Sequence, residues 1–232
     1  FEEQGWRLAG REVKLITEDD EGTPPTALAK TRSLVESQGI HLLIGPLSGA
    51  DTLRFAKQYS DAGLKGKLAL IGGGTFTDEH VLRSMGDEVL GVVTALHYSA
   101  ALPNPANRKF VQAYGAKYKQ LPSYYSEGSY VAGLALKAAL EATGGDIENA
   151  DKFLAALRRV DLTDAPRGPV RFDDFGNPVQ NIYVRKVERV GGKLQNTVIF
   201  TFPGVSQFWT YKTEDYLKNP VYSRDYPPCT RC

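Results

Sequence analysis

A strand, a helix and a second strand follow one another over residues 11–50, and this succession limits the fold more than any other feature of the chain. Val13 and Leu15 alternate with polar residues and predict a first strand, which ends at the acidic residues 18–21. The second strand, residues 40–45, is apolar almost throughout, as is typical of a parallel strand covered by helices on both faces. We therefore expect an open α/β sheet.

The segment between these strands carries the signals of a helix. Thr23 is a suitable N-cap, Pro24 suits the first helical position, and Gly39 ends the apolar repeat. In open α/β sheets, ligands bind beyond the carboxyl ends of the strands. Residues 45–49 follow the second strand at that position, so this loop is the first candidate for a binding site.

Composition argues against several classes of function. The chain has 232 residues, enough for one large domain or two small ones, and its formal net charge is +1. Basic and acidic residues are mixed along the sequence and form no basic stripe for phosphates, so we expect no nucleic acid partner. No stretch approaches the roughly 18 apolar residues of a membrane-spanning helix.

Strands and helices alternate up to residue 160. A strand over residues 68–71 runs into three glycines, and because the Rossmann and P-loop spacings are missing there, we interpret the glycines as backbone that closely approaches a neighbour or a ligand. A strand over residues 91–98 ends on His97 and Tyr98. Helices are expected over residues 51–63, 77–85, from Asn104 onward, 130–143 and 150–160.

From residue 168 onward the apolar period changes from helical to alternating. The expected antiparallel strands are residues 170–172, 182–187 and 194–200, with turns at 174–177 and 191–192. The tail from residue 208 is rich in tyrosine and proline. We expect it to form an extended strap packed by its aromatic side chains.

The sequence shows no pattern of an enzyme active site, a metal site or a cofactor site. Gly-x-Ser-x-Gly is absent, and His41, His80 and His97 lie in unrelated settings. Cys229 and Cys232 form a Cys-x-x-Cys pair. Because they follow prolines instead of opening a helix, a local disulfide or free thiols is the favoured interpretation over redox catalysis.

The paired acids Asp19 and Asp20 also suit a phosphoacceptor receiver domain. Such a domain needs an acceptor aspartate at the end of its central strand. This chain has Gly45 and Pro46 there, so we do not favour that fold.

Several short motifs occur in a characteristic order. They are Asp19 with Asp20, the helix from Pro24, and residues 43–48, 62–67, 71–74, 139–145 and 168–173 with Gly176. In this order the chain resembles the periplasmic solute-binding proteins of the branched-chain amino acid type, which are receptors of ABC importers. The tyrosines and histidines near the expected cleft resemble the members that bind aromatic acids more than those that bind leucine.

The resemblance implies a type I periplasmic-binding-protein fold, with two lobes of parallel sheets flanked by helices and a β-rich C-terminal part. It assigns residues 1–48 to part of the first lobe, 49–90 to part of the second, 91–145 mainly to the first, 146–204 mainly to the second and 205–232 to an aromatic and proline-rich strap.

Relative to the family, the chain is expected to be incomplete. In the family the loop at Ser48 belongs to the first lobe, whereas the segment from Gly49 resembles one much later in the second lobe. We interpret this junction as an internal deletion or as the omission of part of a longer polypeptide. A real fusion would leave the second lobe without its opening strands, which would expose apolar surface or pair with another chain.

The resemblance also implies a set of ligand contacts. They are Ser48, Gly49, Gly74, Thr75, Tyr98 and Tyr124. A hydroxyl and free N–H groups at a helix start suit a carboxylate, and tyrosines supply an apolar wall with a polar tip. An amino acid would also need an acidic partner for its ammonium, and Glu127 is the nearest candidate. Each contact has a structural alternative, such as Ser48 as a helix cap, Gly74 as a turn and Tyr124 as core.

We expect a receptor that is not an enzyme, which closes on a small-molecule carboxylate and delivers it to an ABC permease in the membrane. The resemblance implies a periplasmic or extracellular location, with the signal peptide outside this sequence. A hydrophobic amino acid and an aromatic acid both remain open as the ligand. The alternatives are a ligand-sensing module with the same fold and an enzyme that uses the acidic residues 18–21.

Overall fold

A seven-stranded sheet runs through the molecule. The computed structural model describes residues 5–8, 11–21, 23–44, 49–221 and 223. The strands of the sheet are β3 (Leu42–Ile44), β4 (Ala69–Gly73), β5 (Val93–Leu96), β6 (Asp161–Leu162), β7 (Val170–Phe172), β8 (Pro178–Val190) and β9 (Lys193–Val205). Their order is β3-β4-β5-β8-β7-β6, and β9 pairs with β8.

The sheet changes from parallel to antiparallel at its middle. β3, β4 and β5 pair in parallel, whereas β8 runs antiparallel to β5, β7 and β9. This confirms the expected parallel pattern near the start and the alternating pattern from residue 168 onward. Gly191 and Gly192, which both have positive φ, turn β8 into β9 as predicted.

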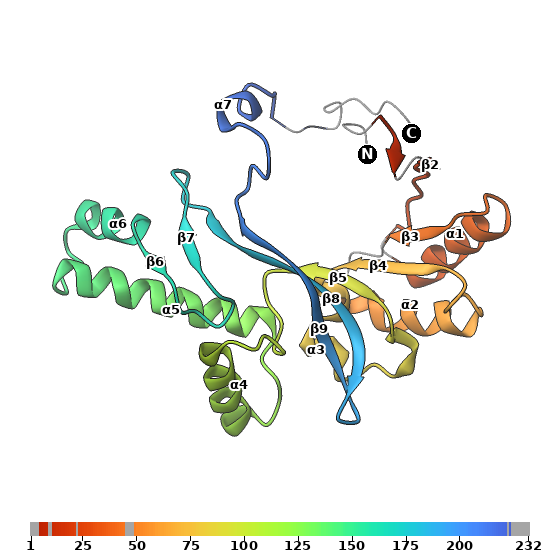
Figure 1. Cartoon of the computed structure of the whole chain (residues 1–232), viewed down its shortest axis with the longest axis horizontal. Helices are drawn as coiled ribbons and strands as arrows, with labels where there is room; N and C mark the ends of the chain where they lie inside the picture. Colours follow the sequence, from red (N-terminus) through yellow and green to blue (C-terminus); the bar gives the residue numbers. More distant parts are fainter. Residues whose placement is uncertain (1–4, 9–10, 22, 45–48, 222, 224–232) are drawn as a thin grey trace.

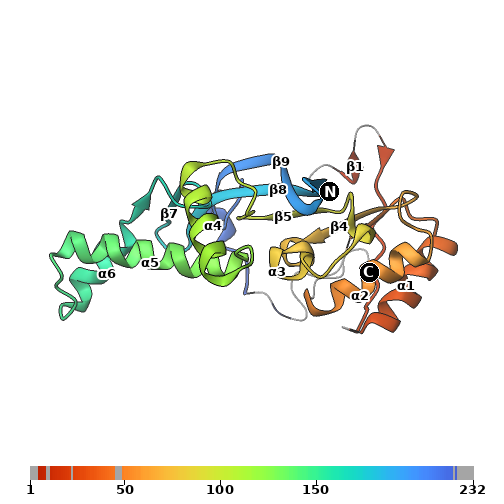
Figure 2. The same cartoon turned by 90° about the horizontal axis from the view of Figure 1, so that it is seen from below.

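Four of the helices of the described residues lie in pairs at the two ends of the molecule. The helices are α1 (Pro24–Glu36), α2 (Gly49–Asp61), α3 (Glu79–Leu82), α4 (Pro105–Tyr118), α5 (Tyr124–Thr143), α6 (Ala150–Arg158) and α7 (Thr213–Tyr216), with short 3-10 turns η2 (Gly74–Thr77) and η3 (Asp87–Val89). Figure 1 places α1 and α2 at one end and α5 and α6 at the other, with β8 and β9 between them. The perpendicular view agrees (Figure 2).

The largest core lies where α1 and α2 cover the parallel strands. Phe55, Ala56 and Tyr59 of α2 are buried against Leu43 and Leu70 of the sheet. The three residues of α2 have helical spacing, and Leu43 and Leu70 are register partners on β3 and β4, so the helix and the sheet each bury one face. β3 and α2, which lie on either side of residues 45–48, therefore form a β-α-β unit with β4.

Two expectations near the start of the chain are wrong. Residues 13–17 form no strand: β2 (Arg11–Glu12) pairs only with β1 (Arg7–Leu8), and Leu15 is 46% exposed. An alternating pattern forms a strand only where a neighbouring strand accepts its hydrogen bonds, and no strand of the described residues pairs with residues 13–17. The second strand is covered on one face only, because Ile44 is 61% exposed.

At the opposite end, α5 packs against α6 and the antiparallel strands. Ala135 and Ala139 of α5 form a core with Val160, against which Phe153 and Phe172 pack. The small side chains predicted close packing of this helix, and the structure confirms it. Gly144 ends α5 in the left-handed conformation.

Candidate ligand-binding site

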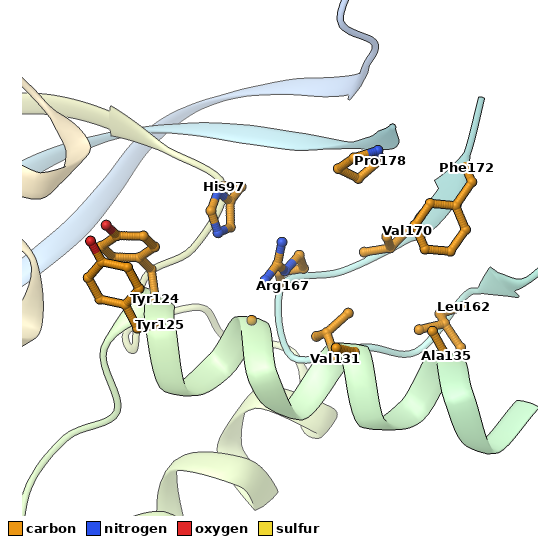
Figure 3. Close-up of a pocket in the computed structure, with 12 residues that line it drawn as sticks. His97, Tyr124, Tyr125, Val131, Ala135, Leu162, Arg167, Val170, Phe172 and Pro178 are labelled. Carbon is orange, nitrogen blue, oxygen red and sulfur yellow. The ribbon is translucent and has the colours of Figure 1, made fainter. Parts of the chain in front are cut away.

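A pocket of about 350 Å³ lies between α5 and the strands β6, β7 and β8. Its lining residues are His97, Tyr124, Tyr125, Gly128, Val131, Ala132, Ala135, Leu162, Arg167, Val170, Phe172 and Pro178. Figure 3 shows the rings of His97, Tyr124 and Tyr125 on one side, the aliphatic residues on the other, and Arg167 between them. This volume is at the small end of the range for ligand pockets.

The ring side of the pocket is built from the end of β5 and the start of α5. The ring of His97 meets that of Tyr124 edge-on at 5.8 Å, and Tyr124 lies against Tyr125 at 4.0 Å between ring centroids. Burial and the charges of Arg167 and Arg185 lower the pKa of His97 to about 4. At neutral pH the imidazole is therefore uncharged, with one nitrogen as donor and one as acceptor.

Arg167 brings a charge into this apolar surrounding. Its Nε donates to Glu127 Oε1 at 3.0 Å and its Nη2 to Glu127 Oε2 at 2.5 Å. Its Nη1 donates to Oε1 of Gln180 at 2.7 Å. Both Arg167 and Glu127 are buried, so this bidentate ion pair is protected from water and from screening by salt.

The loop that carries Arg167 is itself held in place. The hydroxyl of Tyr183 donates to the backbone carbonyl of Arg167 at 2.6 Å, and Asn104 donates to the carbonyl of Pro166 at 2.9 Å. Gly168 has a φ of +91°, and a Cβ there would lie 3.0 Å from the Tyr183 hydroxyl. Only glycine suits this position without strain, so the backbone fixes where the guanidinium lies.

A second buried charged group, Arg185 of β8, lies at the junction of β5, η2 and α3. Its guanidinium donates to the backbone carbonyls of Tyr98 and Gly74, each at 2.8 Å. Glu79 is also buried there and accepts a hydrogen bond from the backbone N–H of Ala100 at 3.0 Å. Burial raises the pKa of Glu79 to about 7, although the charge of Arg185 opposes this shift.

The structure brings some of the predicted contacts together and separates others. Tyr124 lines the pocket, and Glu127 binds the arginine that lines it.

Tyr98 is fully buried in the core, where its hydroxyl donates to Asn107 at 3.0 Å. Gly74 is buried against Leu96, and its carbonyl and that of Tyr98 both accept hydrogen bonds from Arg185.

The remaining predicted contacts lie on the loop after β3 and on η2. Ser48 lies outside the described residues, as do Cys229 and Cys232, and Gly49 begins α2. Thr75 is half-buried in η2 and is not among the described residues that line the pocket.

Sequence reasoning missed the arginine at the centre of the pocket. Arg167 stands directly before Gly168 and Pro169, which belonged to a recognised motif, but a single arginine in a loop gives no signal of burial. His97 was noted as the end of a strand and as one of three histidines in unrelated settings, but it was not among the predicted contacts. Glu127 was predicted as a contact, but as the partner of a ligand ammonium and not of an arginine, and it lies before the helix expected over residues 130–143.

The described part of the chain offers neither a cluster of metal ligands nor a membrane-spanning helix. No group of three or more His, Cys, Asp or Glu side chains in it could hold a metal ion. Nor does that part contain a helix long and apolar enough to cross a membrane.

Comparison with known proteins identifies the family. Residues 47–193 match the model of a family described as periplasmic binding protein. The chain belongs to this family. This periplasmic binding protein is 37% identical over 162 residues to the Leu/Ile/Val-binding protein homolog 6 of Brucella melitensis, a match that covers 67% of the chain and 40% of the relative.

Two solved structures from Rhodopseudomonas palustris are similar in both sequence and fold. One is a solute-binding protein of an ABC transporter in complex with 3,4-dihydroxybenzoic acid; it is 35% identical, with a TM-score of 0.70, over 77% of this chain and 49% of that one. The other, in complex with benzoate, is 32% identical with a TM-score of 0.67, over 84% of this chain and 51% of that one. The expected α/β fold of type I periplasmic binding proteins is thereby confirmed.

This periplasmic binding protein spans 40% of the length of its curated relative and about half of each solved structure. The family match begins beside the expected junction between Ser48 and Gly49. Both solved relatives are solute-binding proteins of transporters, and their ligands carry a carboxylate on an aromatic ring.

Proposed function

We propose that this periplasmic binding protein serves as a non-enzymatic receptor of an ABC importer, which binds a small carboxylate and delivers it to a permease. The observation that carries the proposal is Arg167, a buried guanidinium in a pocket otherwise lined by aromatic and aliphatic side chains. A cation at the centre of an apolar pocket suits a ligand with one anionic group and one apolar body.

The relatives support the same class of ligand. The solved relatives bind 3,4-dihydroxybenzoic acid and benzoate, and the curated relative is named for leucine, isoleucine and valine. All of these ligands join a carboxylate to an apolar body. We therefore propose a hydrophobic amino acid or an aromatic acid as the ligand, and a location outside the inner membrane where such receptors meet their permeases.

The pocket is sufficient in energetic terms. A micromolar dissociation constant corresponds to about −8 kcal/mol. Hydrogen bonds to a charged group contribute about 1.5–3 kcal/mol each, and burying one apolar side-chain-sized group adds a similar amount. Tyr124 and Val170 offer the apolar contact on the two sides of Arg167.

A thermal-shift panel tests this proposal. The 232-residue chain is heated with leucine, phenylalanine, benzoate or 4-hydroxycinnamate at 1 mM. For a ligand present at 100 times its dissociation constant, stabilisation of about 2.7 kcal/mol is expected, which is a shift of several degrees. If a chain that is folded by circular dichroism responds to none of the four, the proposal is wrong.

A further inference from the structure

The charges around the pocket distinguish the two classes of ligand left open above. Arg167 is the one permanently charged side chain among the described residues that line the pocket. The nearest acid, Glu127, is fully buried and holds Arg167 by two hydrogen bonds. The neighbouring His97 is uncharged at neutral pH, as described above.

Arg167 retains donors for a ligand. A guanidinium has five N–H groups in a planar fork. Glu127 takes one on Nε and one on Nη2, and Gln180 takes one on Nη1. Two N–H groups are left, one on each terminal nitrogen, which is the number that a carboxylate accepts in a bidentate pair.

Glu127, in contrast, is fully buried, is not among the described residues that line the pocket, and accepts from Arg167 on both of its oxygens. A ligand ammonium could reach the carboxylate of Glu127 only by displacing Arg167. The buried guanidinium of Arg167 would then have lost its anionic partner. The described residues that line the pocket include no acidic side chain, so an ammonium would find the hydroxyls and ring faces of Tyr124 and Tyr125 and the neutral ring of His97. An ammonium would thus lose its hydration without gaining an anionic partner.

We propose that Arg167 is the carboxylate-binding residue of this pocket, and that Glu127 is a positioning residue which orients Arg167 and thereby excludes ligands with an ammonium beside the carboxylate. The ligand class is an apolar monocarboxylate. This inference rests on the proposed function as a carboxylate receptor. It assigns to Glu127 a role different from the ammonium partner expected from the sequence.

Two matched pairs of ligands test the selectivity. 3-Phenylpropanoate differs from phenylalanine, and 4-methylpentanoate from leucine, only by the missing α-ammonium. Isothermal titration of the full chain at pH 7.5 should give dissociation constants at least about 30-fold lower for the acid than for the amino acid in each pair. Tighter binding of phenylalanine or leucine than of the matching acid would overturn this inference and leave the proposed function standing. If none of the four ligands binds detectably, both are wrong.

Substitution of Arg167 tests the anchor. Arg167→Met should weaken 3-phenylpropanoate binding by at least about 100-fold, because two hydrogen bonds to a charged group are lost. Since a lone buried carboxylate can prevent folding, the double variant Glu127→Leu/Arg167→Met removes both charges together. If the folded double variant binds 3-phenylpropanoate as tightly as the unchanged chain, Arg167 is not the anchor.

Two further variants complete the design. Arg171→Met removes an exposed arginine of β7 that does not line the pocket, and it should leave binding unchanged. Glu127→Gln distinguishes the two roles of Glu127. If Glu127 positions Arg167, the ratio of acid to amino-acid affinity will not rise in this variant. A selective loss of phenylalanine affinity would instead identify Glu127 as the ammonium partner and contradict the inference.

Discussion

The carboxylate of Asp78 accepts a hydrogen bond from the backbone N–H of Tyr124 at 3.1 Å, and so joins the start of α3 to the first residue of α5. Its other oxygen accepts from the backbone N–H of His80 at 3.1 Å. One side chain thus satisfies N–H groups at two helix starts, one of which carries the ring side of the pocket.

Asp78→Ala should lower the free energy of unfolding by about 1–3 kcal/mol, because both helix-start N–H groups lose a charged acceptor. Asp78→Asn keeps one carbonyl oxygen as an acceptor, so it should lower the free energy of unfolding by less than Asp78→Ala does. Urea denaturation measures the difference. Asp174→Ala, in an exposed turn, is the control and should change stability by less than about 0.5 kcal/mol. Equal effects of Asp78→Ala and Asp174→Ala would show that the link is unimportant.

Substitution by alanine should have opposite effects on stability at Gly74 and at Gly133. A Cβ on Gly74 would lie 2.5 Å from Cβ of Leu96, whereas one on Gly133 of α5 would meet nothing within 4 Å. Gly74→Ala should therefore destabilise the protein by about 1–3 kcal/mol through overpacking. Gly133→Ala should stabilise it by about 0.5–1 kcal/mol, because alanine favours the helix. A harmless Gly74→Ala would favour the ligand-contact role predicted from the sequence over this packing role.

Glu79 and His97 should give the protein two opposing responses to pH. Glu79 has its pKa raised from 4.5 to about 7, so the folded state retains a proton that the unfolded state releases. The contribution of Glu79 to stability is complete below pH 4.5 and is lost as pH rises through 7.

His97 has its pKa lowered from 6.5 to about 4, so the contribution of His97 to stability is complete above pH 6.5 and is lost as pH falls through 4. Each of the two contributions is worth about 3 kcal/mol at most.

The measurement is the free energy of unfolding between pH 4.5 and 8 for the unchanged chain, Glu79→Gln and His97→Gln. Relative to the unchanged chain, Glu79→Gln should gain stability as pH rises from 4.5 to 7. His97→Gln should gain stability as pH falls from 6.5 to 4.5. Parallel curves for all three proteins would mean that neither group titrates differently in the folded state.

Phe208 connects the segment after β9 to the rest of the fold. It is buried, with its ring 5.5 Å from those of Phe175 and Tyr216. Phe208→Ala should cost about 3–5 kcal/mol in urea denaturation. Val221→Ala is the control, because Val221 is 90% exposed. A cost below about 0.5 kcal/mol for Phe208→Ala would mean that this segment unfolds separately from the sheet.

The sequence predicted best those elements whose signals are local. Asn104 caps α4 by accepting a hydrogen bond from the N–H of Asn107 at 2.7 Å, and Pro24 opens α1, as their residue types indicate. The strand expected at residues 13–17 failed because a strand also needs a partner, which alternation alone does not supply.

The centre of the site depends on contacts that local patterns do not encode. Arg167 and Glu127 are 40 positions apart, and neither the burial of their ion pair nor its geometry follows from the residues around either one. The lowered pKa of His97 likewise depends first on its burial and then on the charges of Arg167 and Arg185, which are distant in the sequence. The family resemblance led to the proposal of a carboxylate ligand, but only the three-dimensional structure brings the arginine to the pocket.

The most direct test of this account is a crystal structure of the chain with 3-phenylpropanoate bound. We predict that the carboxylate lies within about 3 Å of the guanidinium of Arg167 and the ring between Tyr124 and Val170. A ligand bound at the turn of Gly74 and Thr75, without contact to Arg167, would contradict the account.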